Sequence, residues 1–251
     1  PANARIFDLL VVGGGINGAG IARDAAGRGL SVLLVEKDDL AAATSSWSTK
    51  LIHGGLRYLE HYEFRLVAES LAEREVLLAQ APHLIAPLSF VLPHEPHLRP
   101  AWMIRAGLFL YDHLATRRSL PASRKIDLRT HPAGRSLDPR YRTAFEYSDG
   151  WVDDARLVVA NAVDAFERGA EVLTRTACVR LQREGGEWIA ALRAADGRER
   201  TLRARVVVNA AGPWVAEFLD HCTPTPARHH PRMIRGSHVV VRRMFEHEFA
   251  Y

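Results

Sequence analysis

The chain has 251 residues, of which 47% are hydrophobic and 25% are charged, and its formal net charge is +4. This composition is ordinary for a globular protein and excludes collagen-like, low-complexity and disordered chains. The length favours one large domain or two intertwined domains. The small positive charge does not indicate a nucleic-acid partner, and two cysteines are too few for a disulfide framework. The chain carries no signal-peptide pattern and no apolar run of bilayer length, so we expect it to be cytoplasmic.

The first elements predict a parallel sheet. Residues 8–12 and 31–35 are short apolar runs that read as buried strands. Residues 16–28 are rich in alanine and predict a helix between them, with Gly29 at its C-terminal cap. The order strand, helix, strand is that of a dinucleotide-binding unit.

The turn between the first strand and the first helix has the pattern GxGxxG. We expect Gly13 to permit a tight turn, Gly15 to let a pyrophosphate approach the backbone, and Gly18 to let helix and strand pack closely. Glu36 ends the second strand about 20 residues later, where an acidic residue binds a ribose diol. The alternative is a glycine-rich turn without a ligand. The cofactor-binding residues expected in this loop are Gly13, Gly14, Gly15, Ile16, Asn17 and Gly18.

The middle of the chain predicts a departure from this first fold. A helix is expected over residues 56–80, where Pro82 stops it, and a strand over 88–92. Residues 121–149 are polar and rich in turn residues, which predicts a surface excursion. The apolar residues 102–111, flanked by arginines, form either an interfacial helix on anionic lipid or a buried helix, and run length favours the buried helix.

The second half predicts a helix, a meander and a return to the sheet. The expected helix begins at Asp153 and Asp154 and ends at Gly169. Pro213 is expected to begin a further helix. The strands expected here span residues 171–174, 176–182, 187–193 and 199–204 as an antiparallel meander, then 205–209 and 237–242.

The choice between NAD and FAD depends on the segments outside the fingerprint. The meander and the small residues at 209–214 favour the longer cofactor, FAD, over a nicotinamide cofactor. Residues 44–50 carry hydroxyl groups and one lysine that suit a diphosphate and a ribityl chain, although an exposed linker is the alternative.

Several segments resemble the FAD-dependent glycerol-3-phosphate dehydrogenase family of the aerobic bacterial type, within the D-amino-acid-oxidase-like FAD superfamily. They are VGGGINGAGIARDAAGRG (12–29), TSSWSTKLIHGGLRYLEHYEFRLV (44–67), residues 92–114, FEYSDGWVDDARLV (145–158) and GSHVVV (236–241). The resemblance implies an α/β fold: a Rossmann-like FAD-binding domain with an antiparallel meander, plus part of an α+β substrate domain. The implied segments are residues 1–81 and 150–222 for the FAD-binding domain, and 82–149 and 223–251 for the substrate domain.

The resemblance also implies the chemistry. Family members oxidise sn-glycerol 3-phosphate to dihydroxyacetone phosphate and pass electrons to membrane quinone. A glycerol-3-phosphate oxidase that uses oxygen is the close alternative, and an inactive flavin-binding fragment is another. Family members are about twice as long, so the chain resembles an N-terminal half, and we expect the 251 residues alone to be inactive. The partners implied are glycerol 3-phosphate, a quinone, the anionic inner face of the cytoplasmic membrane and a second copy in a homodimer.

The resemblance further implies the site residues. The catalytic candidates are His53, Arg57, Tyr58 and His238, each of which has a structural role as its alternative. FAD is expected to be noncovalent, although His53 lies where related amine-oxidising flavoproteins carry a covalent link. No histidine or cysteine spacing suits a metal. The remaining cofactor-binding candidates are Glu36, Lys37, Thr44, Ser45, Ser46, Ser48, Lys50, Leu51, Ile52, Cys178, Val179, Ala210, Ala211, Gly212 and Trp214.

Overall fold

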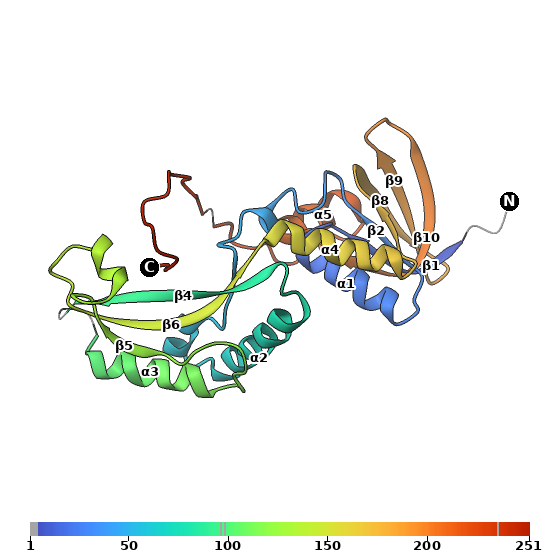
Figure 1. The fold of residues 1–251 in the computed structure, drawn as a ribbon. Helices are drawn as coiled ribbons and strands as arrows, with labels where there is room; N and C mark the ends of the chain where they lie inside the picture. The colour runs from blue at the N-terminus through green and yellow to red at the C-terminus, as the bar shows by residue number, and fades with distance from the viewer. Residues whose placement is uncertain (1–4, 96, 98, 235) are drawn as a thin grey trace. The chain divides into compact units, whose positions relative to one another are not determined.

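The computed structural model describes residues 5–95, 97, 99–234 and 236–251 (Figure 1). The chain forms two compact units, the first from Pro1–Ser48 and Asp154–His238, the second from Thr49–Asp153 and Val239–Tyr251. The chain therefore leaves the first unit after Ser48, earlier than the boundary expected at residue 81. The reason is that the helix of residues 64–80 packs on the sheet of the second unit.

The first unit contains a sheet of six strands in the order β7-β2-β1-β10-β9-β8. Its parallel part pairs β1 with β10, β1 with β2, and β2 with β7, whereas β8 and β9 are antiparallel additions. The strands are β1 (Ile6–Val12), β2 (Val32–Val35), β7 (Glu171–Leu173), β8 (Thr176–Glu184), β9 (Glu187–Ala194) and β10 (Glu199–Asn209).

Two expectations for this sheet were wrong. The strands predicted at 199–204 and 205–209 are one strand, β10, which pairs with β9 along its first part and with β1 along its second. The strand predicted at 171–174 does not join the meander. Instead, β7 extends the parallel part beside β2.

Two helices pack on one face of this sheet, and small side chains form their contact with each other. α1 (Ile16–Gly27) and α4 (Asp154–Glu167) pack against each other, with Ala22, Ala25 and Ala165 buried in one core. Alanine permits the close approach of the two helices. The predicted helices 16–28 and 153–169 are therefore confirmed within the usual uncertainty of helix ends.

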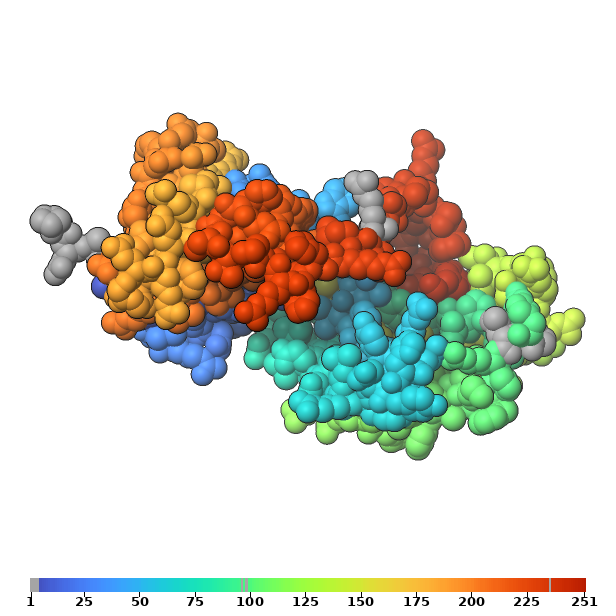
Figure 2. Space-filling model, turned by 180° about the vertical axis from the view of Figure 1, so that it is seen from behind, coloured from blue at the N-terminus to red at the C-terminus, as the bar shows by residue number. Residues whose placement is uncertain are grey.

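On the other face, β8, β9 and α5 (Val215–Cys222) enclose a second core that contains Phe7 and Leu192. A single 3-10 turn, η4 (Gly212–Trp214), precedes α5, with Pro213 in its first turn. The α-helix itself begins at Val215, two residues after the start expected at Pro213. Figure 2 shows this part of the chain, in orange-red, at the surface beside the lighter orange strands. The strand predicted at 237–242 is absent from the described residues, and Val239, Val240 and Val241 are exposed without a partner strand.

The second unit is built on an antiparallel sheet in the order β3-β6-β4, with β5 also paired to β6. The strands are β3 (Leu51–Ile52), β4 (Ile85–His94), β5 (Arg124–Asp127) and β6 (Thr143–Val152). The surface excursion predicted over 121–149 was wrong, because β6 is the central strand and buries Ala144 and Phe145. Its Ser, Asp and Gly residues read as a turn, yet they are buried at the centre of the sheet.

Two further predictions in this unit need correction. The helix predicted over 56–80 is interrupted at Tyr62, whose left-handed φ of 60° separates the 3-10 helix η2 (Leu56–His61) from α2 (Phe64–Gln80). The third helix, α3 (Ala101–His113), buries Leu108 but leaves Trp102 69% exposed, so it is not a fully buried helix. Among the described residues, no helix combines the length and hydrophobicity that a membrane crossing requires.

Candidate functional site

The glycine loop joins β1 to α1 and has the geometry that its sequence predicts. Gly13 has a φ of 115°, and a Cβ atom there would lie 2.4 Å from the Ala210 carbonyl oxygen. A Cβ atom on Gly18 would lie 1.8 Å from the Gly13 carbonyl oxygen. Gly13 thus permits the turn and Gly18 the contact of helix and strand, as predicted.

A cavity of about 390 Å³ opens beside this loop in the first unit. It lies at the carboxyl ends of β1, β2 and β10, the edge of a parallel sheet where cofactors bind. Eleven of the predicted cofactor residues line it: Gly13, Gly15, Glu36, Lys37, Thr44, Ser45, Cys178, Ala210, Ala211, Gly212 and Trp214.

The other predicted cofactor residues do not line this cavity. Gly14, Ile16, Asn17 and Gly18 belong to the loop and the first turn of α1 behind it, and Ser46 and Ser48 follow in the chain. Val179 lies at the irregular register of β8. Lys50, Leu51 and Ile52 belong to the second unit. Further lining residues were not predicted, because no motif marks them: Asp38, Thr176, Glu217 and Cys222.

Polar groups beside this loop are placed where they could bind an anion and a diol. The Glu36 carboxylate accepts hydrogen bonds from the backbone N–H groups of Gly14 at 2.6 Å and Asp38 at 2.9 Å. The Ser45 hydroxyl accepts from the N–H of Ile16 at 2.9 Å, because Gly15 offers α1 no capping side chain. A carboxylate has further lone pairs, so Glu36 retains acceptors for ribose hydroxyls.

The space in front of Gly15 is the feature that fits a dinucleotide. A Cβ atom on Gly15 would meet only the Ser45 hydroxyl, at 3.0 Å, so no backbone packing requires a glycine here. The missing side chain instead leaves the helix N-terminus open, where N–H groups and the helix dipole attract phosphate. The residues present therefore fit the diphosphate and ribose of FAD.

A separate cavity of about 530 Å³ lies in the second unit. Three of the predicted catalytic residues, His53, Arg57 and Tyr58, line it. Arg57 is exposed at this cavity, and its charge acts on the nearby Glu60 carboxylate, which forms its ion pair with Arg99. Four further lining residues were not predicted: His61, Phe90, Tyr147 and Asp149. The last three lie on β4 and β6, strands whose sequence pattern carries no functional signal.

The hydrogen bond of His53 assigns the position of its ring proton. His53 Nδ1 accepts from the Gly55 N–H at 2.9 Å, so the neutral ring carries its proton on Nε2. His53 therefore offers a donor to the cavity. His238, by contrast, is exposed in a segment without regular structure and lines neither cavity.

No group of histidine, cysteine, aspartate and glutamate side chains suited to a metal ion occurs within the described part of the chain.

Residues 8–250 match the family described as FAD dependent oxidoreductase. The chain belongs to this family. FAD is therefore its cofactor, as expected, and the α/β fold expected for the FAD-dependent oxidoreductases is confirmed.

Two relatives are similar to the chain over nearly its whole length. The chain is 60% identical over 248 residues to a glycerol-3-phosphate dehydrogenase of Pseudomonas aeruginosa, covering 99% of this chain and 48% of the relative. It is 58% identical over 251 residues to a D-erythritol 1-phosphate dehydrogenase of Brucella abortus, covering 100% of this chain and 50% of the relative. The chain thus spans about half the length of these relatives.

A solved structure shares the fold. The glycerol-3-phosphate dehydrogenase of Bacillus halodurans, complexed with FAD, superimposes with a TM-score of 0.63 at 29% identity, covering 86% of this chain and 36% of that chain. The resemblance stated from sequence motifs is therefore confirmed at the level of the family and of its relatives.

Proposed function

We propose that this oxidoreductase, in the context of the whole protein, oxidises the C2 hydroxyl of sn-glycerol 3-phosphate to give dihydroxyacetone phosphate. The observation that carries the proposal is the 60% identity, over 99% of the chain, to a protein named glycerol-3-phosphate dehydrogenase. The substrate loses two electrons and two protons, one from C2 and one from its hydroxyl. FAD, when bound, supplies the two-electron acceptor.

The first unit provides the residues that would hold FAD. We assign the diphosphate to the glycine loop, where Gly15 leaves space at the N-terminus of α1. Glu36 is the acceptor for the adenosine ribose, since its carboxylate is already oriented by Gly14 and Asp38. Lys37 lies 5.8 Å from the Trp214 ring and helps to close the same cavity.

The second unit provides groups suited to the substrate. We assign the substrate phosphate to Arg57, because a guanidinium exposed at this cavity can bind a phosphate dianion through two parallel hydrogen bonds. Tyr58 packs over Gly55 at the same cavity and offers a hydroxyl. His53 donates from Nε2 when its ring is neutral. His238, which lines neither cavity, is a candidate for the group that accepts the hydroxyl proton on the family resemblance alone.

The test is oxidation of sn-glycerol 3-phosphate by the whole protein with an artificial electron-accepting dye. We expect FAD-dependent turnover, with a far lower kcat/KM for glycerol, which lacks the phosphate. Equal kcat/KM for glycerol and glycerol 3-phosphate would contradict the assignment of a phosphate site.

A second candidate substrate is D-erythritol 1-phosphate. The relative that bears this name is 58% identical over the full 251 residues, nearly the same as the first. Both substrates carry a phosphate next to secondary hydroxyl groups, so Arg57 would serve either. The ratio of the two kcat/KM values decides between them.

We also propose that the protein docks on anionic membrane lipid and passes electrons to quinone. In support, α3 leaves Trp102, Met103 and Phe109 exposed, and Arg105 and Arg118 are exposed nearby in the chain. Flotation with vesicles that contain anionic lipid tests docking, with neutral vesicles as the control.

The electron acceptor is tested by measuring hydrogen peroxide during turnover in air. One hydrogen peroxide formed for each substrate oxidised would identify an oxidase instead of a quinone-linked dehydrogenase. A homodimer, tested by light scattering, remains part of this proposal.

A further inference from the structure

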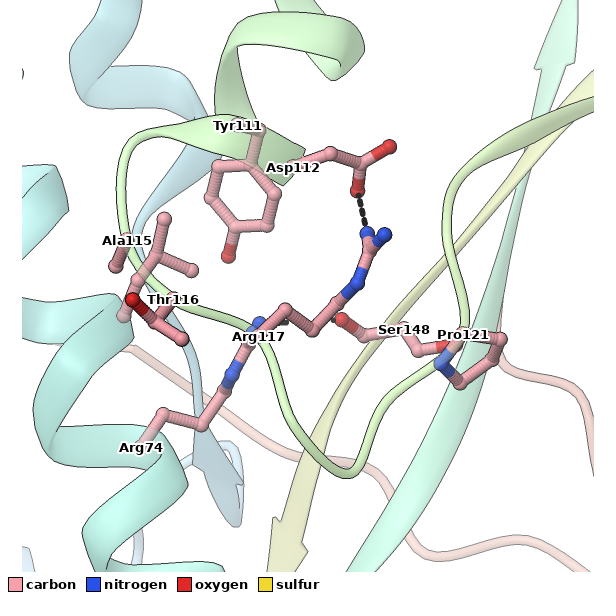
Figure 3. Close-up of a pocket in the computed structure, with 9 residues that line it drawn as sticks. Arg74, Tyr111, Asp112, Ala115, Thr116, Arg117, Pro121 and Ser148 are labelled. Atoms are coloured by element: carbon pink, nitrogen blue, oxygen red, sulfur yellow. Dashed lines mark hydrogen bonds and ion pairs between the residues drawn. The ribbon is translucent and has the colours of Figure 1, made fainter.

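A buried polar network adjoins the cavity that Arg57 lines, and one of its members, Asp149, is itself a lining residue. Tyr111 on α3 donates its hydroxyl hydrogen to the Asp149 carboxylate, whose two oxygens lie at 2.9 and 3.0 Å. Arg74 on α2 donates from Nη1 to Asp149 Oδ1 at 2.5 Å and to the Ser148 carbonyl oxygen at 3.2 Å. Figure 3 shows Arg74 and Tyr111 reaching from their two helices into the same small pocket.

The network is almost completely removed from solvent. Tyr111 is 3% exposed, Arg74 4% and Asp149 3%. Burial raises the pKa of the Asp149 carboxyl, while Arg74, Tyr111 and His53 oppose that rise. Burial and the Asp149 charge raise the pKa of the Tyr111 hydroxyl, so Tyr111 stays protonated and remains a donor. A buried charge needs such partners, so each member holds the others in place.

The network ends on the backbone of the turn that carries His53. The Tyr111 oxygen, while it donates to Asp149, accepts a hydrogen bond from the Gly54 N–H at 2.7 Å. A Cβ atom on Gly54 would lie 2.8 Å from that oxygen and 2.4 Å from Leu71 Cδ2. Gly54 is thus fitted against α2 and α3 with no room for a side chain.

The same turn fixes the residues that face the cavity. Gly55 has a left-handed φ of 70° and is the N-cap of η2, where the Tyr58 N–H donates to the Gly55 carbonyl oxygen at 2.8 Å. The Gly55 N–H also holds His53 Nδ1. A shift of Gly54 would therefore move His53, Arg57 and Tyr58 together.

We propose that Tyr111, Asp149 and Arg74 are positioning residues that hold the 53–58 segment in the geometry needed to bind the substrate phosphate. This inference rests on the proposed function, since it assigns the phosphate to Arg57. Arg74 and Tyr111 do not line the Arg57 cavity, and Tyr111 acts through the Gly54 N–H. Asp149 does line it, and its carboxylate holds the Tyr111 hydroxyl in place.

The experiment compares the whole protein carrying Tyr111→Phe with the wild type. The variant keeps the ring and removes the atom that holds Gly54. We expect a three- to tenfold weaker Kd for inorganic phosphate, measured by calorimetry, and a matching rise in KM for sn-glycerol 3-phosphate. Tyr141→Phe is the matched control, because the Tyr141 hydroxyl contacts only the exposed Arg140 in the described structure, and its phosphate Kd should not change.

The possible results distinguish the positioning role from a purely structural role and from a failure of the proposed function. A Tyr111→Phe protein with a lower Tm but unchanged phosphate Kd and KM would overturn the inference and leave the network a structural one. A wild type that binds no phosphate would overturn it as well. If Tyr111→Phe does not fold, Arg74→Lys takes its place with the same expectation, because it keeps the charge, removes the planar fork that holds Asp149 and does not line the cavity. If the wild type binds phosphate but turns over neither polyol phosphate, the result contradicts the proposed function and leaves the positioning role intact.

Discussion

The carbonyl oxygen of Gly13 occupies the position beside Gly18 where a side chain would begin, 1.8 Å from an ideal Cβ atom. The contact lies between two backbones, the end of β1 and the first turn of α1, and neither can rotate away. This close approach sets the position of the helix N-terminus at the cofactor cavity.

Gly18→Ala should therefore destabilise the protein. A methyl group at this position must push α1 away from β1, and overpacking of this kind costs about 1–3 kcal/mol. Chemical denaturation measures the loss in the free energy of unfolding. Gly20→Ala in the same helix is the control, because its Cβ would have no atom within 4 Å, and alanine there should be neutral or stabilising. Equal stabilities of the two variants would contradict the packing role of Gly18.

Gly15→Val tests the cofactor site independently of stability. Its Cβ atom would have only the Ser45 hydroxyl within 4 Å, at 3.0 Å, and its methyl groups would occupy the space assigned to the diphosphate. We expect a folded variant that does not retain FAD, measured by the flavin absorbance of the purified protein. Gly20→Val serves as the control and should keep its flavin. A Gly15→Val protein that stays yellow with unchanged affinity would contradict the assignment.

The sequence predicted the first unit better than the second. Its glycine loop, apolar strands and alanine-rich helices obey local rules, so Gly13, Gly18 and Glu36 could be assigned before the fold was known. Strand β6 could not be predicted in this way. Its Ser148, Asp149 and Gly150 look like turn residues, and only pairing with β3 and β4 makes them a strand.

In the candidate site, too, the sequence predicted the residues that belong to a motif and not those that only the fold brings together. Residues of the fingerprint and of the 53–58 segment were found from motifs. Asp149 and Tyr111 were not, because their contact joins residues 38 positions apart in the chain and depends on how α3 packs. The pairing of a buried carboxylate with Arg74 leaves no periodic signal in the sequence.

The cofactor should be noncovalent. His53 Nδ1 is engaged with the Gly55 N–H, and the resemblance to glycerol-3-phosphate dehydrogenases implies a flavin without a covalent link. Acid precipitation of the whole protein should leave FAD in the supernatant, measured by its absorbance. Yellow colour retained in the pellet would show a covalent link and point to His53.

Glu75 should make the protein sensitive to acid. Burial alone raises the pKa of this carboxyl, but hydrogen bonds from the Ser119 hydroxyl and the backbone N–H groups of Ser119 and Arg118 outweigh burial and hold the pKa below its usual 4.5. Because the folded pKa is depressed, the stabilisation is present above pH 4.5 and is lost as the pH falls through the folded value.

The measurement is the free energy of unfolding against pH for wild type and Glu75→Gln. We expect the variant to be less stable at neutral pH and to lose less stability on acidification below about pH 5. Glu69→Gln, at an exposed position of the same helix, is the control and should follow the wild-type curve. A Glu75→Gln curve parallel to wild type would show that this carboxyl does not contribute to acid sensitivity.

The central claim is that Arg57 binds the phosphate of a polyol phosphate in an FAD-dependent oxidation. Steady-state kinetics of the whole protein with sn-glycerol 3-phosphate and an electron-accepting dye test it most directly, with Arg57→Gln compared with Arg65→Gln. Arg65 is the matched control because it is an exposed arginine on α2, where it pairs with Glu69. The account predicts that Arg57→Gln raises KM by about tenfold or more, with full flavin content, because a charge-assisted pair to the phosphate is lost. Arg65→Gln should match the wild type. Wild-type protein that binds FAD but oxidises no polyol phosphate, or an Arg57→Gln variant with unchanged KM, would contradict the claim.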